Sequence, residues 1–251
     1  MAEAPNLRLD LVNSAENVVL VRAALTGLAE AIGLHEGDLA DIQTAATEAC
    51  NNVVQHAYPE GPGPLEVELR LAPGKLDLLV RDEGRGMHPG ADGADGAHAG
   101  GREPGIGVPV IRALSHRSEF RERDGGGTEV WSEFATAGIS CAEPLARREG
   151  QPASERVTPE SVALVLDPVE VAEGVLPRVL CVLAARAHFS TEGLAEVRRF
   201  ALELVSQSAR AGEGEPLGLC ASVKPRALEL AMGARRLVLS DPRDGGSPVA
   251  Y

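Results

Sequence analysis

Two helical patterns in direct succession, followed by alternating strands, constrain the fold of the N-terminal half most. Apolar residues recur at three- and four-residue steps from Val18 to Ile32, and Gly33 marks the end of this helix. A second helix is expected from Glu36 to about His56. Because a helix that directly follows a helix does not fit strict βαβ alternation, the pattern predicts an α+β fold.

Alternation of apolar and polar residues predicts the strands that accompany these helices. Strands are expected at residues 7–12, 65–71, 76–82, 115–121 and 128–134, with a short helix at 108–113. Between residues 83 and 107 the sequence is dominated by Gly, Ala and Asp and offers little to bury. A segment of this length and composition is usually either functional or disordered.

The C-terminal half reads as a weakened repeat of the first. "LADIQTAATEAC" at 39–50 aligns with "LAEVRRFALELV" at 194–205. The stretch between the halves is rich in Pro, Ser, Glu and Arg, which is typical of a linker. We therefore expect a first domain at residues 1–138, a linker at 139–160, and a second, smaller α/β domain at 161–251. The second domain is either a degenerate copy of the first or an unrelated small domain.

Charge and composition exclude some partners. The formal net charge is −13 and aromatic residues make up 3% of the chain, so phosphate backbones would be repelled and few rings are available to stack bases. Nucleic acid is therefore not expected as a partner. The sequence has no basic leader followed by an apolar segment and no run of about eighteen apolar residues. These features predict a cytoplasmic protein without a membrane partner.

A carboxylate and an amide interrupt the inner face of the second predicted helix. Glu48 and Asn52 are four residues apart, so their side chains point from the same side, at the edge of the apolar stripe. A carboxylate near a hydroxyl can act as a general base, and an amide oxygen is a suitable ligand for Mg²⁺. Taken alone, the spacing fits a solvated helix edge better.

Glycine pairs follow one predicted strand and precede one predicted helix. Asp82 ends a strand, and Gly84 and Gly86 after it allow the backbone to approach a ligand closely. Gly105 and Gly107 stand before a helix whose N-terminal amides can bind phosphate. Each pair by itself is a weak signal, because most such pairs are only turns.

The order of these segments carries more information than any one of them. "TEACNNVVQHAY", "RDEGRGM", "GIGVPVIRAL" and "GGGTEVW" together resemble the GHKL, or Bergerat-fold, ATPase superfamily. Within it the chain is similar to serine-kinase anti-sigma factors of the RsbW/SpoIIAB type, over residues 7–134. The resemblance implies a Bergerat-type sandwich of helices on a mixed sheet. The P-loop sequence GxxxxGK[ST] is absent.

The resemblance also implies a role for each motif residue. Glu48 would be the catalytic base, and Asn52 would contact the nucleotide and hold Mg²⁺. Asp82 would accept a hydrogen bond from the amino group of adenine, with Thr128 nearby. Residues 88–104 would form a lid that closes over ATP. The remaining contacts to ATP would come from Gly84 and Gly86 under the base and from Gly105, Gly107 and Val108 around the phosphates.

The implied function is that of an ATP-dependent anti-sigma factor with serine protein kinase activity. Its substrate would be a STAS-domain anti-anti-sigma factor, and its other partner a sigma factor, in a partner-switching mechanism that regulates transcription. The alternative is a non-catalytic ATP-binding module with the same partners. A histidine-kinase catalytic domain is a third interpretation, which we disfavour because few residues precede the first strand.

The second half is expected to lack an ATP site. In the aligned repeat Glu48 corresponds to Glu203, but Asn52 falls on Gln207 and Asp82 falls on Ala234. Since the resemblance implies homodimers, the protein is expected to be either a homodimer or an intramolecular pseudo-dimer whose second half imitates a partner subunit.

Overall fold

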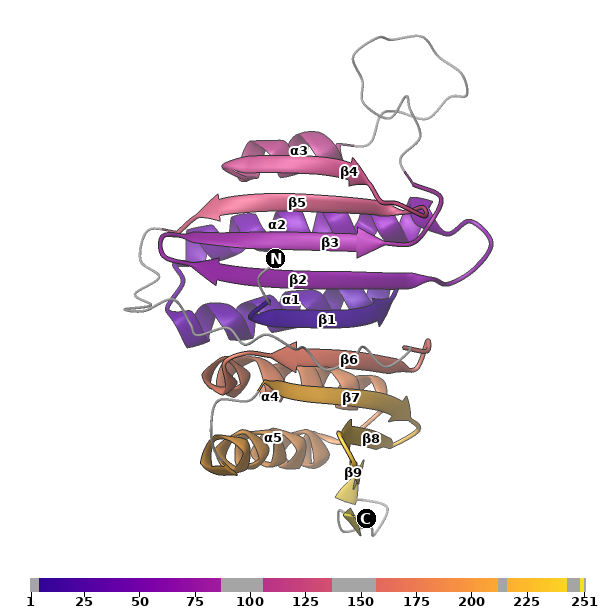
Figure 1. Ribbon diagram of the computed structural model, residues 1–251. Helices are drawn as coiled ribbons and strands as arrows, with labels where there is room; N and C mark the ends of the chain where they lie inside the picture. The colour runs from indigo at the N-terminus through magenta and orange to yellow at the C-terminus, as the bar shows by residue number, and fades with distance from the viewer. Residues whose placement is uncertain (1–4, 87–105, 137–156, 212–215, 243–248, 251) are drawn as a thin grey trace, which may run out of the picture.

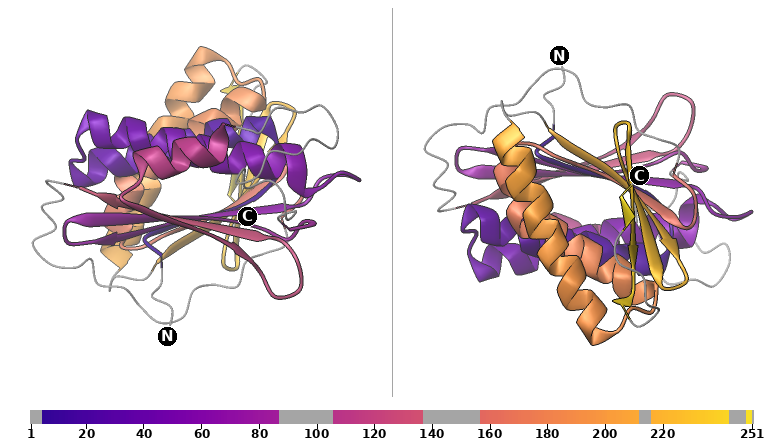
Figure 2. Two further views of the ribbon diagram at one scale, coloured as in Figure 1. Left: turned by 90° about the horizontal axis from the view of Figure 1, so that it is seen from above. Right: turned by 90° about the horizontal axis from the view of Figure 1, so that it is seen from below.

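The computed structural model describes residues 5–86, 106–136, 157–211, 216–242 and 249–250. Its strands form one sheet in the order β10-β9-β8-β7-β6-β1-β2-β3-β5-β4 (Figure 1). Every neighbouring pair of described strands is antiparallel, where the resemblance had implied a mixed sheet. Helices pack on this sheet, so the predicted α+β, helix-on-sheet arrangement is confirmed (Figure 2).

The described residues of the N-terminal half form four helical segments and five of these strands. In chain order they are β1 (Leu7–Val12), α1 (Ala15–Ile32), α2 (Glu36–Asn52), η1 (Val53–Ala57), β2 (Pro64–Ala72), β3 (Lys75–Asp82), α3 (Gly107–Leu114), β4 (Arg117–Glu122) and β5 (Thr128–Ala135). Each strand and helix predicted for this half is present, and apart from the end of α2 the bounds agree closely with the predicted ones.

Helix α1 is capped at both ends, and its C-terminal end at Gly33 is as predicted. The Ser14 side chain accepts a hydrogen bond from the amide of Asn17, which satisfies one of the donors that a helix start leaves free. Gly33 closes the helix in the left-handed conformation, with φ of 69°. The second helix differs from its prediction, because α2 ends at Asn52 and the chain continues as the π-helical turn η1.

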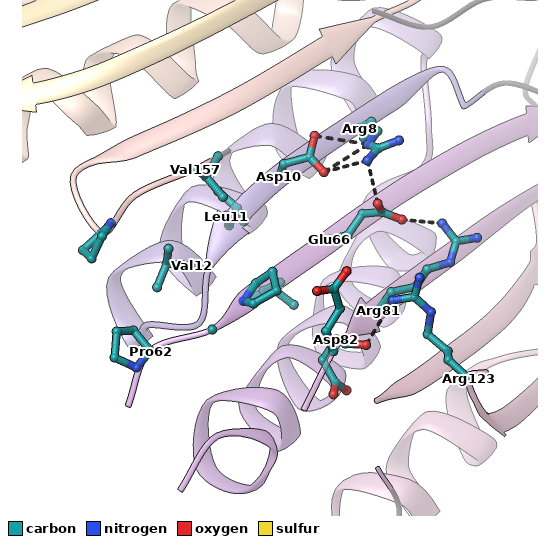
Figure 3. Close-up of a pocket in the computed structure, with 15 residues that line it drawn as sticks. Arg8, Asp10, Leu11, Val12, Pro62, Glu66, Arg81, Asp82, Arg123 and Val157 are labelled. Atoms are coloured by element: carbon teal, nitrogen blue, oxygen red, sulfur yellow. Dashed lines mark hydrogen bonds and ion pairs between the residues drawn. The ribbon is translucent and has the colours of Figure 1, made fainter. Parts of the chain in front are cut away.

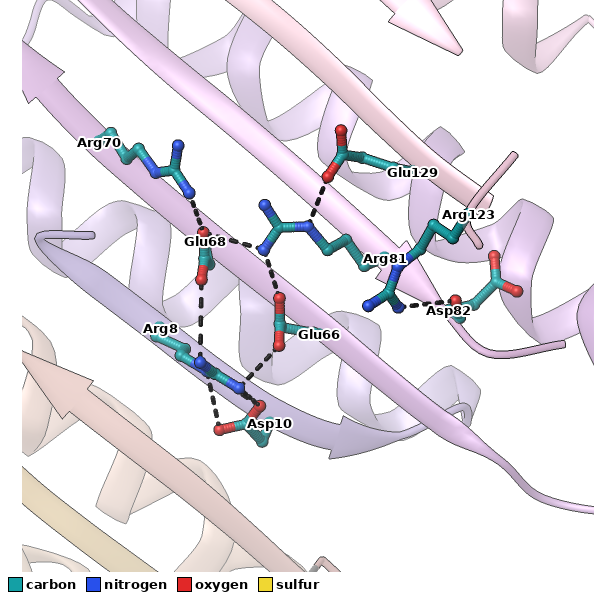
Figure 4. A network of polar contacts seen from close by, with 9 residues as sticks. All are labelled: Arg8, Asp10, Glu66, Glu68, Arg70, Arg81, Asp82, Arg123 and Glu129. Carbon is teal, nitrogen blue, oxygen red and sulfur yellow. Dashed lines mark hydrogen bonds and ion pairs between the residues drawn. The ribbon is translucent and has the colours of Figure 1, made fainter. Parts of the chain in front are cut away.

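Alternation along the strands separates a buried face from a charged one. The leucines and valines of β1, β2 and β3 that face the helices are buried. The residues between them form a network of ion pairs on the other face (Figure 4). Arg81 lies at its centre and pairs with Glu66, Glu68 and Glu129, and the Arg81–Glu129 contact is 2.7 Å long. Glu68, which is 4% exposed, also pairs with Arg70 at 2.7 Å.

The C-terminal half continues the same sheet. Its elements are β6 (Ser161–Leu166), α4 (Val169–Arg186), α5 (Thr191–Ala211), β7 (Leu217–Lys224), β8 (Ala227–Met232), β9 (Arg235–Ser240) and β10 (Val249–Ala250). Strand β6 pairs with β1, and buried side chains of both halves form one hydrophobic cluster. The division of the chain into two domains at residues 139–160 stays a prediction. No helix in the described ranges combines the length and apolar character needed to cross a membrane.

Candidate nucleotide-binding site

The two polar side chains of α2 meet the start of α3. Glu48 and Asn52 are both half-buried at the edge of the apolar face of α2. Gly107, the first residue of α3, lies directly against them. A Cβ atom on Gly107 would be 3.0 Å from Oε2 of Glu48 and 3.3 Å from Oδ1 of Asn52. The structure thus brings Gly107 beside two predicted site residues that lie far from it in the sequence.

The first turn of α3 presents backbone donors at this point. Pro109 has no N–H group, and the amide of Val110 donates to the carbonyl oxygen of Ile106 at 3.0 Å. The amides of Gly107 and Val108 are the donors that helix geometry leaves without an acceptor inside the helix. Because the start of a helix also carries a partial positive charge, these two amides are suited to bind a phosphate oxygen.

Asp82 lies at the end of β3, on the helix-facing side of the sheet. It lies on the same face as the buried residues Leu78 and Val80, because alternate residues of a strand share a face, and it is itself 5% exposed. Its Oδ1 accepts a hydrogen bond of 2.8 Å from the amide of Gly84. Burial raises the pKa of the Asp82 carboxyl above its usual 3.8, while interactions with Gly84 and with the amide and hydroxyl of Thr128 act in the opposite direction. This carboxylate is therefore a fixed acceptor in a partly desolvated place.

Close backbone contacts join the end of β3 to the neighbouring segments. A Cβ on Gly84 would lie 2.4 Å from the carbonyl oxygen of Ala57, and a Cβ on Gly127 would lie 2.1 Å from that of Asp82. Both positions therefore require glycine. Ala57 ends η1, which directly follows Asn52, and its carbonyl also accepts a hydrogen bond from Arg85. The π-helical turn thus connects the two ends of the candidate site.

Gly86 has a positive φ of 75°, and a Cβ there would lie 2.9 Å from Oε1 of Glu122. Gly105 and the predicted lid at residues 88–104 lie outside the described residues. Of the nine predicted site residues, the structure describes eight, in two groups. Glu48, Asn52, Gly107 and Val108 form the α2–α3 end, and Asp82, Gly84, Gly86 and Thr128 form the β3 end.

Tyr58 belongs to this site although the sequence analysis did not single it out. Its hydroxyl accepts a hydrogen bond of 2.6 Å from the amide of Glu83 and donates one of 2.6 Å to the carbonyl oxygen of Pro64. Burial raises the pKa of Tyr58 to about 12, so the hydroxyl keeps its proton at neutral pH. Tyr58 therefore holds in place the turn that follows Asp82. It is the last residue of the segment "TEACNNVVQHAY", but that pattern does not predict hydrogen bonds to the backbone of Glu83 and Pro64.

A hollow of about 550 Å³ lies on the opposite, charged face of the sheet (Figure 3). Its lining includes Arg8, Glu66 and Arg81, and Arg123 links it to β3 by donating to the carbonyl oxygen of Asp82 at 3.0 Å. Asp82 also lines the hollow, but Glu48, Asn52 and Gly107 do not, so the hollow is not the α2–α3 end of the candidate site.

The donors and acceptors of the α2–α3 end fit a nucleotide with a bound magnesium ion. Magnesium prefers oxygen ligands, and the Oδ1 atom of Asn52 supplies one beside two helix amides. The absent Cβ at Gly107 leaves space where a phosphate could approach the backbone. No cluster of three or more His, Cys, Asp or Glu side chains exists in the described part of the chain. An ion at this site would therefore rely on few protein ligands, as Mg²⁺ bound with phosphates does.

Comparison with known proteins identifies the class to which this fold and site belong. Residues 11–134 match the family model described as histidine kinase-like ATPase domain. The serine-protein kinase RsbW of Halalkalibacterium halodurans is 32% identical over 117 residues, which are 44% of this chain and 72% of that protein. RsbW of Bacillus thuringiensis is 32% identical over 84 residues, 34% of this chain and 52% of that protein.

A crystal structure of the RsbU and RsbW domains of a Mycobacterium tuberculosis protein is also similar. It covers 51% of this chain and 32% of that chain, with 25% identity and a TM-score of 0.39, which is too low to bear on the fold. The sequence matches are sufficient without it. The chain belongs to the RsbW family of GHKL, or histidine kinase-like, ATPases.

Proposed function

We propose that this protein is an ATP-dependent anti-sigma factor that phosphorylates a serine of a STAS-domain anti-anti-sigma factor. It would bind a sigma factor and release it by partner switching, in the cytoplasm. The names of the relatives support the kinase part of this proposal. The observation that carries it is the meeting of Glu48 and Asn52 with the start of α3, while Asp82 lies at the other end of η1.

Each group of the site has a task in phosphoryl transfer. Asp82 accepts from the amino group of adenine, and the amides of Gly107 and Val108 bind phosphate oxygens. Asn52 holds Mg²⁺, which when bound offsets the charge of the phosphates. These groups position the donor, and positioning with electrostatic stabilisation supplies most of the catalysis in this class of reaction.

Glu48 acts on the acceptor. Its carboxylate takes the proton of the serine hydroxyl as the serine oxygen forms a bond to the γ-phosphorus. The bond between the γ-phosphorus and the oxygen that bridges it to the β-phosphate breaks, and ADP leaves with the electron pair. Glu48 has no role in binding the adenine, so its loss should stop transfer and leave nucleotide binding largely intact.

The test is phosphorylation of a purified STAS-domain protein in the presence of ATP and Mg²⁺, followed by mass spectrometry for phosphoserine. Glu48→Gln should abolish the product while ATP binding remains within about threefold. Glu203→Gln is the matched control, since Glu203 is an exposed glutamate at the corresponding place on α5. If ATP binds and no phosphoserine forms with the unmodified protein, the kinase activity is wrong and the non-catalytic ATP-binding module is correct.

A further inference from the structure

The C-terminal half repeats the architecture of the first half element by element. Strands β1 and β6 both have 6 residues, and helices α1 and α4 both have 18. In each half a strand reaches its first helix through two residues, and a second helix leads to a hairpin, β2–β3 or β7–β8. The tight turns of the hairpins also correspond, since Gly74 and Arg226 both follow a proline and have φ of 74° and 57°.

Equivalent elements of the two halves contact each other. Strand β1 pairs with β6 in antiparallel register, with Leu7 opposite Leu166 and Asp10 opposite Ala163. The order β7-β6-β1-β2 at the middle of the sheet is therefore symmetrical (Figure 1). An antiparallel pairing of equivalent strands is what a two-fold axis generates between identical subunits.

The helices of the two halves follow the same symmetry. Helices α1 and α4 cross where Gly27 meets Gly174, and a Cβ on Gly27 would lie 2.3 Å from the carbonyl oxygen of Gly174. At the other end of the contact, Arg186 of α4 donates to Oδ1 of Asn17 at 2.8 Å. Since Asn17 lies early in α1 and Arg186 ends α4, the two helices run in opposite directions. The strand β1 and the helix α1 thus each contact their equivalent within one chain, as they would contact a second subunit in a symmetrical dimer.

Where the structure describes the second half, the equivalents of the candidate site residues other than Glu48 are missing. Gln207 of α5, in the place of Asn52, donates to Oε1 of Glu203 at 3.2 Å, so the two side chains bond to each other. In the first half Gly84, Gly86 and α3 stand between β3 and β4. In the second half only Gly233 and Ala234 join β8 to β9. There is no room in that turn for a helix that could bind phosphate.

We propose that the C-terminal half is a nucleotide-free replacement for a second copy of the first half. It covers the β1 edge and the α1 face, so the chain is a monomer with a single nucleotide site. An exposed strand edge pairs readily with another chain, and β6 occupies the one that β1 would present. The expected stoichiometry of one nucleotide per chain rests on the proposed function. The expected monomeric state does not.

Two measurements on the full chain test the proposal. Light scattering over a range of concentrations should give the mass of one chain, 26.2 kDa, with and without ATP and Mg²⁺. Equilibrium dialysis should give one nucleotide per chain. A mass of two chains, or two nucleotides per chain, would overturn the proposal. A monomer that binds no nucleotide would refute the proposed function and leave the pseudo-dimer standing.

A variant at the helix crossing tests the role of the C-terminal half as a cover. Gly174→Val places a side chain where a Cβ would already lie 2.1 Å from the carbonyl oxygen of Gly27, so α1 and α4 must separate. We expect the average mass to rise with concentration as β1 finds a second chain. Gly37→Ala is the control, because its nearest contact would be 3.4 Å away. A Gly174→Val protein with unchanged mass and unchanged thermal midpoint would contradict the proposal.

Discussion

Gly107 begins α3 within contact distance of the Glu48 side chain, and a Cβ at this glycine would lie 3.0 Å from Oε2. The site has a glycine at this point because any side chain would occupy the space between the two helices. Five predictions concern this site and the ion pairs on the other face of the sheet, and each has a measurement that can contradict it.

Gly107→Ala should weaken ATP binding by about tenfold, which corresponds to about 1.4 kcal/mol. The new methyl group would displace the flexible side chains of Glu48 and Asn52, whose oxygens lie 3.0 and 3.3 Å from it. Stability should change little, since alanine is a better helix former than glycine. Calorimetric titration with ATP and Mg²⁺ measures the effect. Unchanged affinity would show that phosphates do not approach this helix start.

Asp82→Asn should weaken ATP binding by about ten- to a hundredfold. The carboxylate would accept a charge-assisted hydrogen bond from the adenine amino group, and such bonds contribute about 1.5–3 kcal/mol. In the variant the side-chain oxygen of the new asparagine can still accept from the amide of Gly84. The N–H₂ group would then face the adenine amino group, which is also a donor. Titration with ATP should show the loss. A variant that binds ATP as well as the unmodified protein would place adenine elsewhere.

The same carboxyl should make ATP binding and stability depend on pH in opposite ways. Because burial raises the pKa of Asp82, binding should begin to weaken on acidification above the usual 3.8. For stability, a carboxyl with a raised pKa in the folded state favours folding while protonated, and this contribution is lost as pH rises through the folded-state pKa. Asp82→Asn should therefore raise the thermal midpoint at pH 7, by an amount that shrinks as the pH is lowered. A lower midpoint at pH 7 would show that the charge of Asp82 stabilises the fold.

Tyr58→Phe should cost about 1–2 kcal/mol of unfolding free energy and also weaken ATP binding. Removing the hydroxyl leaves the Glu83 amide and the Pro64 carbonyl without their partner, while the ring still packs on Gly63. Chemical denaturation measures the first effect and titration the second. Exposed Glu60 nearby provides a control variant, Glu60→Ala. A loss of stability with full ATP affinity would show that Tyr58 does not position the turn after Asp82.

Arg81→Met should destabilise the protein more than Arg121→Met does. Arg81 pairs with three glutamates, one of which, Glu68, is 4% exposed and would lose a partner at 3.0 Å. Breaking a buried pair from one side costs about 3–5 kcal/mol, whereas an exposed pair contributes at most about 1 kcal/mol. The side chain of Arg121 is 60% exposed. Chemical denaturation measures the unfolding free energy of both variants. Equal losses would show that the ion pairs of Arg81 contribute no more than exposed ones.

Much of the local structure could be predicted from the sequence. The end of α1 at Gly33 and the strands of the N-terminal half follow from glycine conformation and from apolar periodicity, which depend on neighbouring residues alone. The boundary of α2 was predicted less well. Its apolar spacing continues beyond Asn52, and the pattern does not distinguish an α-helix from the wider turn η1 that follows.

The residues of the candidate site could be predicted from the sequence, but the residues that hold them in place could not. Glu48, Asn52 and Asp82 stand in segments whose order matches a family, so they could be named in advance. Tyr58 and Arg123 act through bonds to backbone atoms of β2, β3 and the turn after β3. A hydrogen bond to a backbone atom does not require a particular residue type in the partner, so it leaves no recognisable pattern in the sequence.

The sequence by itself determined the helices, the strands and the family, because periodicity, capping residues and motif order are local properties of the chain. Only the tertiary structure decided that β6 pairs with β1, and that Gly27 and Gly174 let α1 and α4 touch. Strand pairing and helix crossing depend on which edge and which small residues meet after the chain has folded back over about 150 residues. It is this long-range pairing that makes the two halves one sheet.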